Sequence, residues 1–478
     1  MKKILWCIWA LIPFFNAYAQ DVIISDPIPV ASDHQLGLIG EIKGNPLLFR
    51  WKEHDYRVIG FNENLQKKFE KRIELEKRLP TVLFVEAGKN DFSIIYFHRQ
   101  KGHLYLRANK YDGNVNLLDT VLIADLGKIF FNPRFKIQES KDKNVLLIHY
   151  LQNEEVVNAF CYQLDEMKLL WKTKFKPENY FREQSFFQMQ VSNTGEMFMI
   201  LKKNNLDTRR RPHKFTILTY SKEANEVSSF DILMQGHTTY DAAFEYDNLN
   251  RQLIGGGFYS LKNGSRINGW FYLRWKPESR EDVLLKFTAF DPVFVADFMN
   301  NKKVRKNATI SNVSIREPVL RRDGGLLMIA EKVTIYNQQN TSQMRRSRSF
   351  GFPSSPGIDY YYEEVLLLSI HPNGELHWSK ILRKKQISHS DGAVGSSFFL
   401  TKTRKKLHFV FNRDIERSTL ISEYIMDGSG DYLENNIIST EGLKSMFRFK
   451  DALQVSHNRI LVWSHWRSRL RLARFEFE

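Results

Sequence analysis

Groups of basic residues occur between residues 209 and 348, and a run of three tyrosines follows the last group. Arginine and lysine side chains brought together attract carboxylates, phosphates and sulfates. Aromatic faces beside such cations suit sugar rings or acidic peptides. The sequence therefore predicts an anion-binding site, although exposed loops are often rich in charge for solubility alone. The candidate binding residues are Arg209, Arg210, Arg211, Lys262, Arg266, Lys302, Lys303, Arg305, Lys306, Arg345, Arg346, Arg348, Tyr360, Tyr361 and Tyr362.

Motifs of catalytic or metal sites are missing from the sequence. It contains no His-Glu-x-x-His pair, no paired cysteine motif and no Gly-x-Ser-x-Gly nucleophile turn. The acidic segment from Asp427 to Asp431 lacks most ligands of a calcium loop and is typical of a hairpin turn. His389, Ser390 and Asp391 are adjacent but match no nucleophile signature. We therefore predict no metal and no cofactor, and the sequence assigns no catalytic residue.

The first 19 residues have the pattern of an export signal. Lys2 and Lys3 precede an apolar stretch from Ile4 to Phe15, and Ala17-Tyr18-Ala19 has the small residues of a cleavage site. The apolar stretch is shorter than the roughly 20 residues of a membrane-spanning helix. No later segment offers a longer uncharged run. We expect export to the periplasm or the cell surface, with no transmembrane segment in the mature chain.

The chain is basic, with 70 Lys and Arg residues against 54 Asp and Glu residues and a formal net charge of +16. Such a charge attracts polyanions. Outside the cytoplasm we expect an acidic protein surface or an anionic glycan as partner, and no nucleic acid. We expect the protein to be a monomer. Cys7 lies in the expected signal, so Cys161 can form no intramolecular disulfide and is predicted to be a buried apolar side chain.

Short polar turns between two strand-like segments recur along the chain at regular intervals. Most intervals are roughly 50 to 57 residues, which is the signature of one repeated supersecondary unit. The turns lie at Asn62, Asp112, Asp165, Lys222, Lys276, Pro372 and Asp427. The longer interval before Pro372 predicts two loop insertions, at about residues 291–308 and 337–359, both of which carry basic residues.

Each repeated unit is expected to contain four short strands. In the second unit they are residues 81–86, 92–98, 104–110 and 116–123. The turn between the third and fourth of these strands contains the Asp-Gly pair at Asp112, which is favoured in tight hairpins. The strands are apolar on both faces, so each small sheet must be covered twice. Sheets stacked face to face around an axis satisfy this demand. The pattern resembles a β-propeller, which is an all-β fold.

The two termini are expected to complete the last unit. An eighth turn would fall at about residue 477, where the sequence stops, so the last unit lacks a fourth strand. Residues 21–26 form a short β-branched strand that Pro27 and Pro29 would end. We predict eight four-stranded antiparallel blades in one domain, residues 20–478, with the N-terminal strand closing the last blade. Seven blades is the alternative, because residues 35–75 are less regular.

The basic segments should share one end of such a ring. Connections from the second to the third strand of a blade, and from one blade to the next, emerge on the same end. We expect an exported, non-enzymatic binding or scaffolding protein that engages an acidic partner through this basic rim. The alternative is a glycan-active hydrolase or lyase with its site at the mouth of the central channel, where carboxylates from different blades would converge.

Two further resemblances concern single segments. Trp171 and Trp378 each follow a turn at the start of a fourth strand and resemble the tryptophan-docking repeat of quinoprotein propellers, in which tryptophan locks neighbouring sheets together. We interpret both as structural, and a quinoprotein-like oxidoreductase is a third alternative for the function.

The segment Tyr360 to Glu375, followed by Lys384-Lys385-Gln386 and Asp391-Gly392, resembles exported bacterial propeller proteins of unassigned function. That resemblance implies a propeller fold and no activity.

Overall fold

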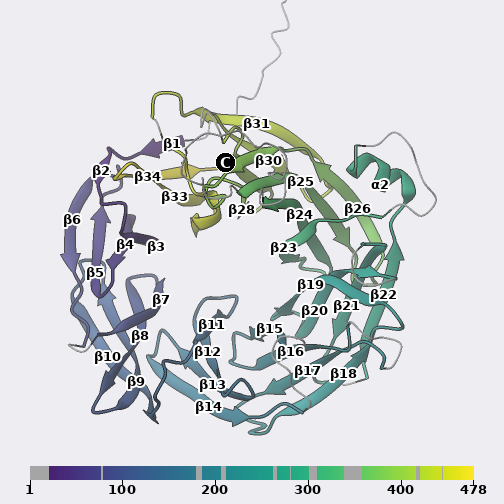
Figure 1. Cartoon of the computed structure of the whole chain (residues 1–478), viewed down its shortest axis with the longest axis horizontal. Helices are drawn as coiled ribbons and strands as arrows, with labels where there is room; N and C mark the ends of the chain where they lie inside the picture. Colours follow the sequence, from purple (N-terminus) through teal and green to yellow (C-terminus); the bar gives the residue numbers. More distant parts are fainter. Residues whose placement is uncertain are drawn as a thin grey trace, which may run out of the picture.

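Eight small antiparallel sheets stand in a ring around a central axis (Figure 1). The computed structural model describes residues 21–76, 79–178, 186–205, 211–261, 266–279, 281–300, 309–337, 358–415, 420–443 and 445–477. Within each blade, neighbouring strands of the chain pair with one another. The protein is an eight-bladed β-propeller.

The first four blades follow one another along the chain. Blade 1 consists of β3 (Gln35–Ile42), β4 (Asn45–Lys52), β5 (Asp55–Phe61) and β6 (Lys67–Arg72). Blade 2 consists of β7 (Thr81–Ala87), β8 (Asp91–Gln100), β9 (His103–Asp112) and β10 (Leu117–Lys128). Blade 3 consists of β11 (Lys136–Glu139), β12 (Val145–Gln152), β13 (Val156–Gln163) and β14 (Lys168–Phe175). Blade 4 consists of β15 (Phe186–Val191), β16 (Met197–Lys203), β17 (Lys214–Tyr220) and β18 (Ser228–Leu233).

The second half of the ring has the same plan, and the described parts of its connections contain two helical elements. Blade 5 consists of β19 (Thr238–Asp247), β20 (Gln252–Ser260), β21 (Gly269–Trp275) and β22 (Val283–Ala289), and helix α2 (Pro292–Phe298) follows it. Blade 6 consists of β23 (Val313–Leu320), β24 (Leu326–Asn337), β25 (Ile358–Ile370) and β26 (Leu376–Leu382), with β27 (Gln386–His389) also pairing with β25. Blade 7 consists of β28 (Phe399–Lys402), β29 (Leu407–Asn412), β30 (Leu420–Met426) and β31 (Tyr432–Ser439). The 3-10 helix η2 (Phe449–Asp451) precedes blade 8, which consists of β32 (Leu453–Ser456), β33 (Arg459–Trp466) and β34 (Arg469–Glu476).

The N-terminal strand supplies the fourth strand of blade 8, as the sequence predicted. Strand β1 (Asp21–Ile24) pairs antiparallel with β34. Ser25 extends this pairing, because its N–H donates to the Leu472 carbonyl (2.8 Å) and its Oγ accepts from the Leu472 N–H (2.9 Å). Pro27 interrupts the pairing, but β2 (Ile28–Pro29) resumes it on β34, so Pro29 does not end the contact. Since blade 1 is also a complete four-stranded sheet, the seven-blade alternative is wrong.

The repeated turns have a common side-chain interaction. At Asn62, Asp112 and Asp427, the side-chain oxygen of the first turn residue accepts hydrogen bonds from the backbone N–H groups two and four residues later. Asparagine and aspartate favour such turns because their short side chains reach the following backbone. Asp427 therefore closes a hairpin, as its sequence context indicated.

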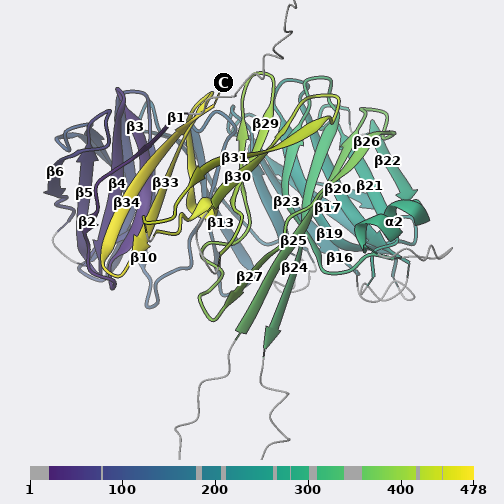
Figure 2. The ribbon, with the colours of Figure 1, turned by 90° about the horizontal axis from the view of Figure 1, so that it is seen from above.

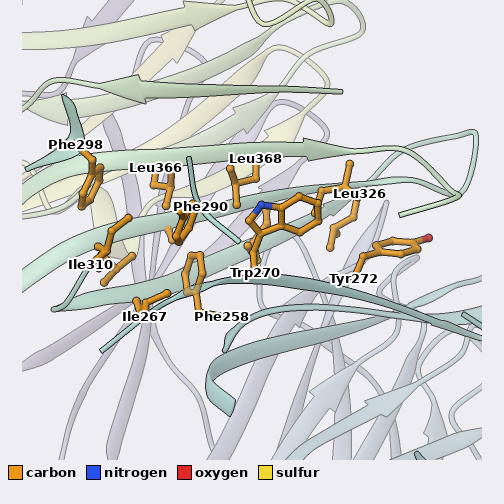
Figure 3. Close-up of a cluster of buried hydrophobic side chains, with 14 of the residues drawn as sticks. Phe258, Ile267, Trp270, Tyr272, Phe290, Phe298, Ile310, Leu326, Leu366 and Leu368 are labelled. Carbon is orange, nitrogen blue, oxygen red and sulfur yellow. The ribbon is translucent and has the colours of Figure 1, made fainter. Parts of the chain in front are cut away.

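Apolar side chains of neighbouring blades fill the space between the sheets. Figure 3 shows the layer between blades 5 and 6, where the ring of Trp270 on β21 faces Leu366 and Leu368 on β25. All three side chains are buried. Burying a side chain of this kind stabilises a fold by about 1.5 to 3 kcal/mol.

Cys161 lies in the layer between blades 3 and 4 with an exposed fraction of 0%. Burial raises the pKa of its thiol to about 12. The prediction that Cys161 is a buried apolar side chain is therefore confirmed.

The two tryptophans of the docking pattern join adjacent blades. The indole N–H of Trp171 donates to the carbonyl of Gly195 (2.8 Å), and that of Trp378 donates to the carbonyl of Gly428 (3.2 Å). Each bond runs from the fourth strand of one blade to a turn of the next. Gly430 lies under the ring of Trp378 with a φ of +88°, and a Cβ there would be 2.7 Å from the ring. Both tryptophans are therefore structural, as interpreted from the sequence.

Strands β24 and β25 extend beyond the ring as a long hairpin (Figure 2). We call this end of the ring the hairpin face, and the other end the opposite face. Connections from second to third strands, and from blade to blade, leave the ring on the hairpin face. The second predicted insertion therefore begins as a continuation of the sheet, with Tyr336 paired to Asp359, and helix α2 occupies part of the first. Residues 301–308 and 338–357 lie outside the described residues.

Candidate binding face

Most of the predicted rim residues lie outside the part of the chain that the structure describes. These are Arg209, Arg210, Lys262, Lys302, Lys303, Arg305, Lys306, Arg345, Arg346 and Arg348. Arg211 and Arg266 are described and exposed, and each lies in a connection from a second to a third strand. The expectation that all the basic segments share one rim therefore stays a prediction. The expected export signal, residues 1–19, also lies outside the described residues.

The three tyrosines belong to the long hairpin. Tyr360 and Tyr361 pair with β24, and the ring of Tyr361 packs edge-on against Tyr336 with the centroids 5.5 Å apart. Tyr362 points into the base of the hairpin and is buried, with an exposed fraction of 8%. The tyrosine run thus divides into two partly exposed rings along the hairpin and one buried ring at its base.

A buried carboxylate lies next to Tyr362. Glu331 has an exposed fraction of 0% and follows the apolar residues Leu326 to Ala330 of β24. Its carboxylate forms an ion pair with Lys384 Nζ (2.6 Å) and accepts hydrogen bonds from Arg316 Nε (2.8 Å) and Ser397 Oγ (2.7 Å). A buried charge needs such partners, because its desolvation otherwise costs several kcal/mol. These partners come from blade 6 and from the connection to blade 7.

Three cations surround the ring of Tyr362. Lys450 Nζ lies 4.1 Å from the ring centroid, the Arg316 guanidinium 5.5 Å and Lys384 Nζ 5.9 Å. Lys450 also donates to the Tyr362 hydroxyl (2.9 Å). Burial lowers the pKa of Lys384, and Glu331 opposes that shift. We call Arg316, Glu331, Tyr362, Lys384 and Lys450 the Tyr362 cluster.

The charges of the Tyr362 cluster do not balance. Glu331 is its one carboxylate, against the three cations Arg316, Lys384 and Lys450. Within the described ranges, no carboxylate lies within ion-pair distance of Lys450, which is exposed. The Arg316 side chain is also accessible, with an exposed fraction of 32%. The cluster therefore presents two accessible cations on a buried support, an arrangement that can bind a carboxylate or a sulfate.

A second exposed feature lies between blades 2 and 3, also on the hairpin face. Phe130 and Phe131 have exposed fractions of 96% and 86%. Arg99 holds the loop that carries them, since its guanidinium donates to the Ile129 carbonyl (2.5 Å) and the Asn132 side chain (3.0 Å). We call residues 129–135 the phenylalanine loop.

A groove of about 850 Å³ lies beside the phenylalanine loop. Its apolar lining includes Leu151, Val157 and Met199, and Lys128 and Arg134 lie at its border. Exposed aromatic side chains next to a groove are typical of protein interaction sites, where aromatic residues contribute most of the binding energy. The groove can therefore take apolar side chains, with cations beside them for acidic neighbours.

The sequence indicated some of these residues and missed others. Tyr362 was a candidate, and Lys384 belonged to a segment singled out by resemblance. Glu331 could have been found as a charged residue inside an apolar strand. Phe130 and Phe131 could have been found as adjacent aromatic residues in a predicted connection. Lys450 carries no local signal of its role.

The described residues show neither a membrane-spanning helix nor a group of residues arranged to bind a metal. No helix among them is long and apolar enough to cross a membrane. No group of three or more His, Cys, Asp or Glu side chains in the described ranges could hold a metal ion. The candidate face is thus defined by cations and aromatic rings.

Comparison with known proteins identifies fold relatives only. The sequence matches no family model and no curated protein. The structure is similar to the WD40 domain of SCAP from fission yeast, with 9% identity, a TM-score of 0.43, and 96% of this chain and 98% of that chain covered. It is also similar to the β-propeller domain of the Trilobed protease from Pyrococcus furiosus, with 10% identity, a TM-score of 0.37, and 84% and 97% of the two chains covered. Identities and TM-scores this low support no statement about activity or partners.

Proposed function

We propose that the protein is an exported, monomeric and non-enzymatic binding protein whose hairpin face engages an acidic partner. The observation that carries the proposal is the charge imbalance of the Tyr362 cluster, where three cations surround one ring and only two of them, Arg316 and Lys384, pair with the single carboxylate. Arg316 and Lys450 are accessible, and the buried Glu331 and Lys384 hold their surroundings in place. An acidic group bound there would balance the charge that Glu331 leaves uncompensated.

The phenylalanine loop supports a protein partner over a glycan. Phe130 and Phe131 offer a large apolar contact on the same face as the cations. A sugar ring could stack on either phenylalanine, but the adjacent groove with its apolar lining favours the apolar side chains that an acidic protein surface also carries. The loop joins β10 to β11 and the Tyr362 cluster lies at blades 6 to 8, so a partner that contacts both must have a surface broad enough to span part of the ring (Figure 1).

The proposal is tested with two labelled probes in a fluorescence anisotropy titration. One probe is an acidic peptide that contains leucine and phenylalanine, and the other is a sulfated oligosaccharide. The variant R211E/R266E/K450E reverses three exposed cations of the hairpin face. We expect it to weaken peptide binding roughly 10- to 100-fold, since each exposed charge contact contributes about 0.2 to 1 kcal/mol and reversal also adds repulsion. Binding by the unaltered protein should weaken as salt is added.

A matched control changes the net charge equally at the opposite face. Lys89, Lys222 and Lys405 are exposed residues of turns that leave the ring on that face. The variant K89E/K222E/K405E should bind the peptide almost as well as the unaltered protein. Equal losses in both triple variants would show that only total charge matters, and would refute the proposed face. Tighter binding of the oligosaccharide than of the peptide would identify the partner as an anionic glycan.

The enzymatic alternative has less support from the geometry. A glycan-active hydrolase needs two carboxyl groups about 5 to 9 Å apart. Glu86 and Glu139 are neighbouring carboxyl groups on the first strands of blades 2 and 3, and Lys143 pairs with Glu86 (2.7 Å). Burial, and then the charge of Glu86, raise the pKa of Glu139 to about 7. We infer that the pair contributes to the packing of the two blades, with Lys143 offsetting part of its negative charge.

A further inference from the structure

A small polar cavity lies between blades 4 and 5 on the opposite face of the ring. Its volume is about 210 Å³, which is below the range of pockets that hold drug-sized ligands. It is lined by residues of the turns and strand ends that leave both blades on this face. The residues that matter for its chemistry are Glu196, Phe230, Tyr246, Arg251, Trp275 and Glu278.

Aromatic rings form one wall of this cavity. Trp275 and Phe230 stack with their centroids 5.0 Å apart and their planes 6° from parallel. Trp275 has an exposed fraction of 3%, and its indole N–H has no hydrogen-bond partner among the described residues. An unpaired buried donor costs about 1 to 3 kcal/mol, so a ligand that supplies an acceptor would gain from it.

Carboxylates form the other wall. Glu278 is paired with Arg251, with 3.0 Å between Oε1 and Nη1, and both side chains are largely exposed. Glu196 is partly buried; among the described residues no group donates a hydrogen bond to its carboxylate, and none forms an ion pair with it, although the charge of Arg251 acts on it from farther away. Glu223 adds a further negative charge nearby. The lining thus contains two carboxyl groups and one arginine, on a protein that is basic overall.

We propose that this cavity binds a small hydroxylated amine, such as an amino alcohol or an amino sugar. The ammonium group of the ligand would donate to the unpaired carboxylate of Glu196. The aromatic wall adds a favourable cation–π interaction, for which tryptophan is the best partner. A hydroxyl group of the ligand would accept from the indole N–H of Trp275.

Charge distinguishes an amine from a neutral sugar as the ligand. Burial, followed by the charges of Glu278 and Glu223, raises the pKa of Glu196 to about 7, and Arg251 opposes this shift only in part. Only a cation would relieve that repulsion, because a neutral hydroxyl leaves the excess charge in place. Burial likewise raises the pKa of Tyr246 to about 12, so its hydroxyl stays neutral. The inference is independent of the proposed function, which concerns the other face.

Binding is measured by NMR titration of the indole resonance of Trp275, assigned by comparison with a Trp275→Phe sample. The probes are ethanolamine and glucosamine, with ethylene glycol and glucose as their neutral counterparts. We expect both amines to bind at least 10-fold more tightly than the counterparts. Glu196→Gln should lower the affinity for the amines at least 10-fold. The matched control is Glu281→Gln, an exposed carboxyl of the β21–β22 turn outside the cavity, which should leave the affinity unchanged.

A second measurement does not depend on any variant. An aliphatic ammonium group stays charged well above neutral pH, so ethanolamine binding at pH 6.5 should ionise Glu196 and release up to one proton. Calorimetry in two buffers of different ionisation enthalpy measures that proton. Equal affinity for amines and neutral counterparts, or binding without proton release, would overturn the proposal. Failure of the peptide titration on the hairpin face would leave this result unaffected.

Discussion

Replacing Lys384 by methionine removes the closest partner of a fully buried carboxylate. Lys384 Nζ lies 2.6 Å from Glu331 Oε1, and their side-chain exposed fractions are 2% and 0%. Breaking a buried ion pair from one side costs about 3 to 5 kcal/mol. Glu331 would keep its hydrogen bonds from Arg316 and Ser397, two of its three partners. We therefore expect Lys384→Met to lower the free energy of unfolding by about 2 kcal/mol, below that range.

The reciprocal change, Glu331→Gln, leaves the Lys384 ammonium buried without its carboxylate. Its remaining oxygen partner is Gln386 Oε1 at 2.9 Å. Burial lowers the pKa of Lys384, and in this variant nothing opposes the shift. Between the lowered pKa and the ordinary value of 10.5, the unfolded state binds the proton and the folded state does not. The stability of Glu331→Gln should therefore rise with pH through that window.

The assay is a double-mutant cycle of Glu331→Leu, Lys384→Met and E331L/K384M, in which urea denaturation followed by intrinsic fluorescence gives the stability of each variant. Apolar replacement of both partners removes the unpaired charge, so the double variant should be more stable than the sum of the single losses predicts. We expect a coupling energy of about 2 kcal/mol. Additive losses would refute the reasoning, because they would mean that each charge is satisfied without the other.

Three further predictions concern the scaffold. Gly430→Ala should lower the free energy of unfolding by about 2 kcal/mol, because the φ of Gly430 is +88° and the new Cβ would lie 2.7 Å from the Trp378 ring. The control is Gly428→Ala, where a Cβ would have no neighbouring atom within 4 Å. This variant should change the free energy of unfolding by less than about 0.5 kcal/mol in the same denaturation assay. Ser25→Pro removes two hydrogen bonds to β34 and should speed hydrogen exchange of the β34 amides at least 10-fold, and unchanged exchange would show that closure contributes nothing. The pKa of Glu139 is about 7 in the folded state, against an ordinary value of 4.5. Between these two pH values the folded state holds a proton that the unfolded state has lost, so the free energy of unfolding should fall by about 1 to 2 kcal/mol as the pH rises from 4.5 to 7. Glu139→Gln should flatten that dependence in thermal melts at several pH values, and an unchanged slope would assign it to other groups.

The three features of interest occupy separate parts of one rigid ring. The Tyr362 cluster and the phenylalanine loop lie on the hairpin face, and the Glu196 cavity lies on the opposite face. Blade packing fixes all three, because each lies where neighbouring blades meet. Binding at one face would therefore leave the other accessible.

The local sequence determined the repeat and its closure. Turn residues such as Asn62, Asp112 and Asp427 reach their own backbone, so their position along the chain is enough to locate a hairpin. The spacing of these turns indicated eight blades, and the complete four-stranded sheet of blade 1 in the structure excluded the alternative of seven. The missing last strand and the β-branched residues 21–26 predicted how the ring closes.

Only the tertiary structure decided which distant residues meet. Glu331 comes from a strand, whereas Lys384 and Lys450 come from two different connections. Their local sequences are unremarkable, apart from the charge that Glu331 adds after a run of apolar residues. Their contact depends on the register of whole blades against one another, which no local pattern encodes. Glu196 and Trp275 likewise meet because blades 4 and 5 pack side by side. Hairpins form from neighbouring residues, whereas sites between blades arise only once the ring is complete.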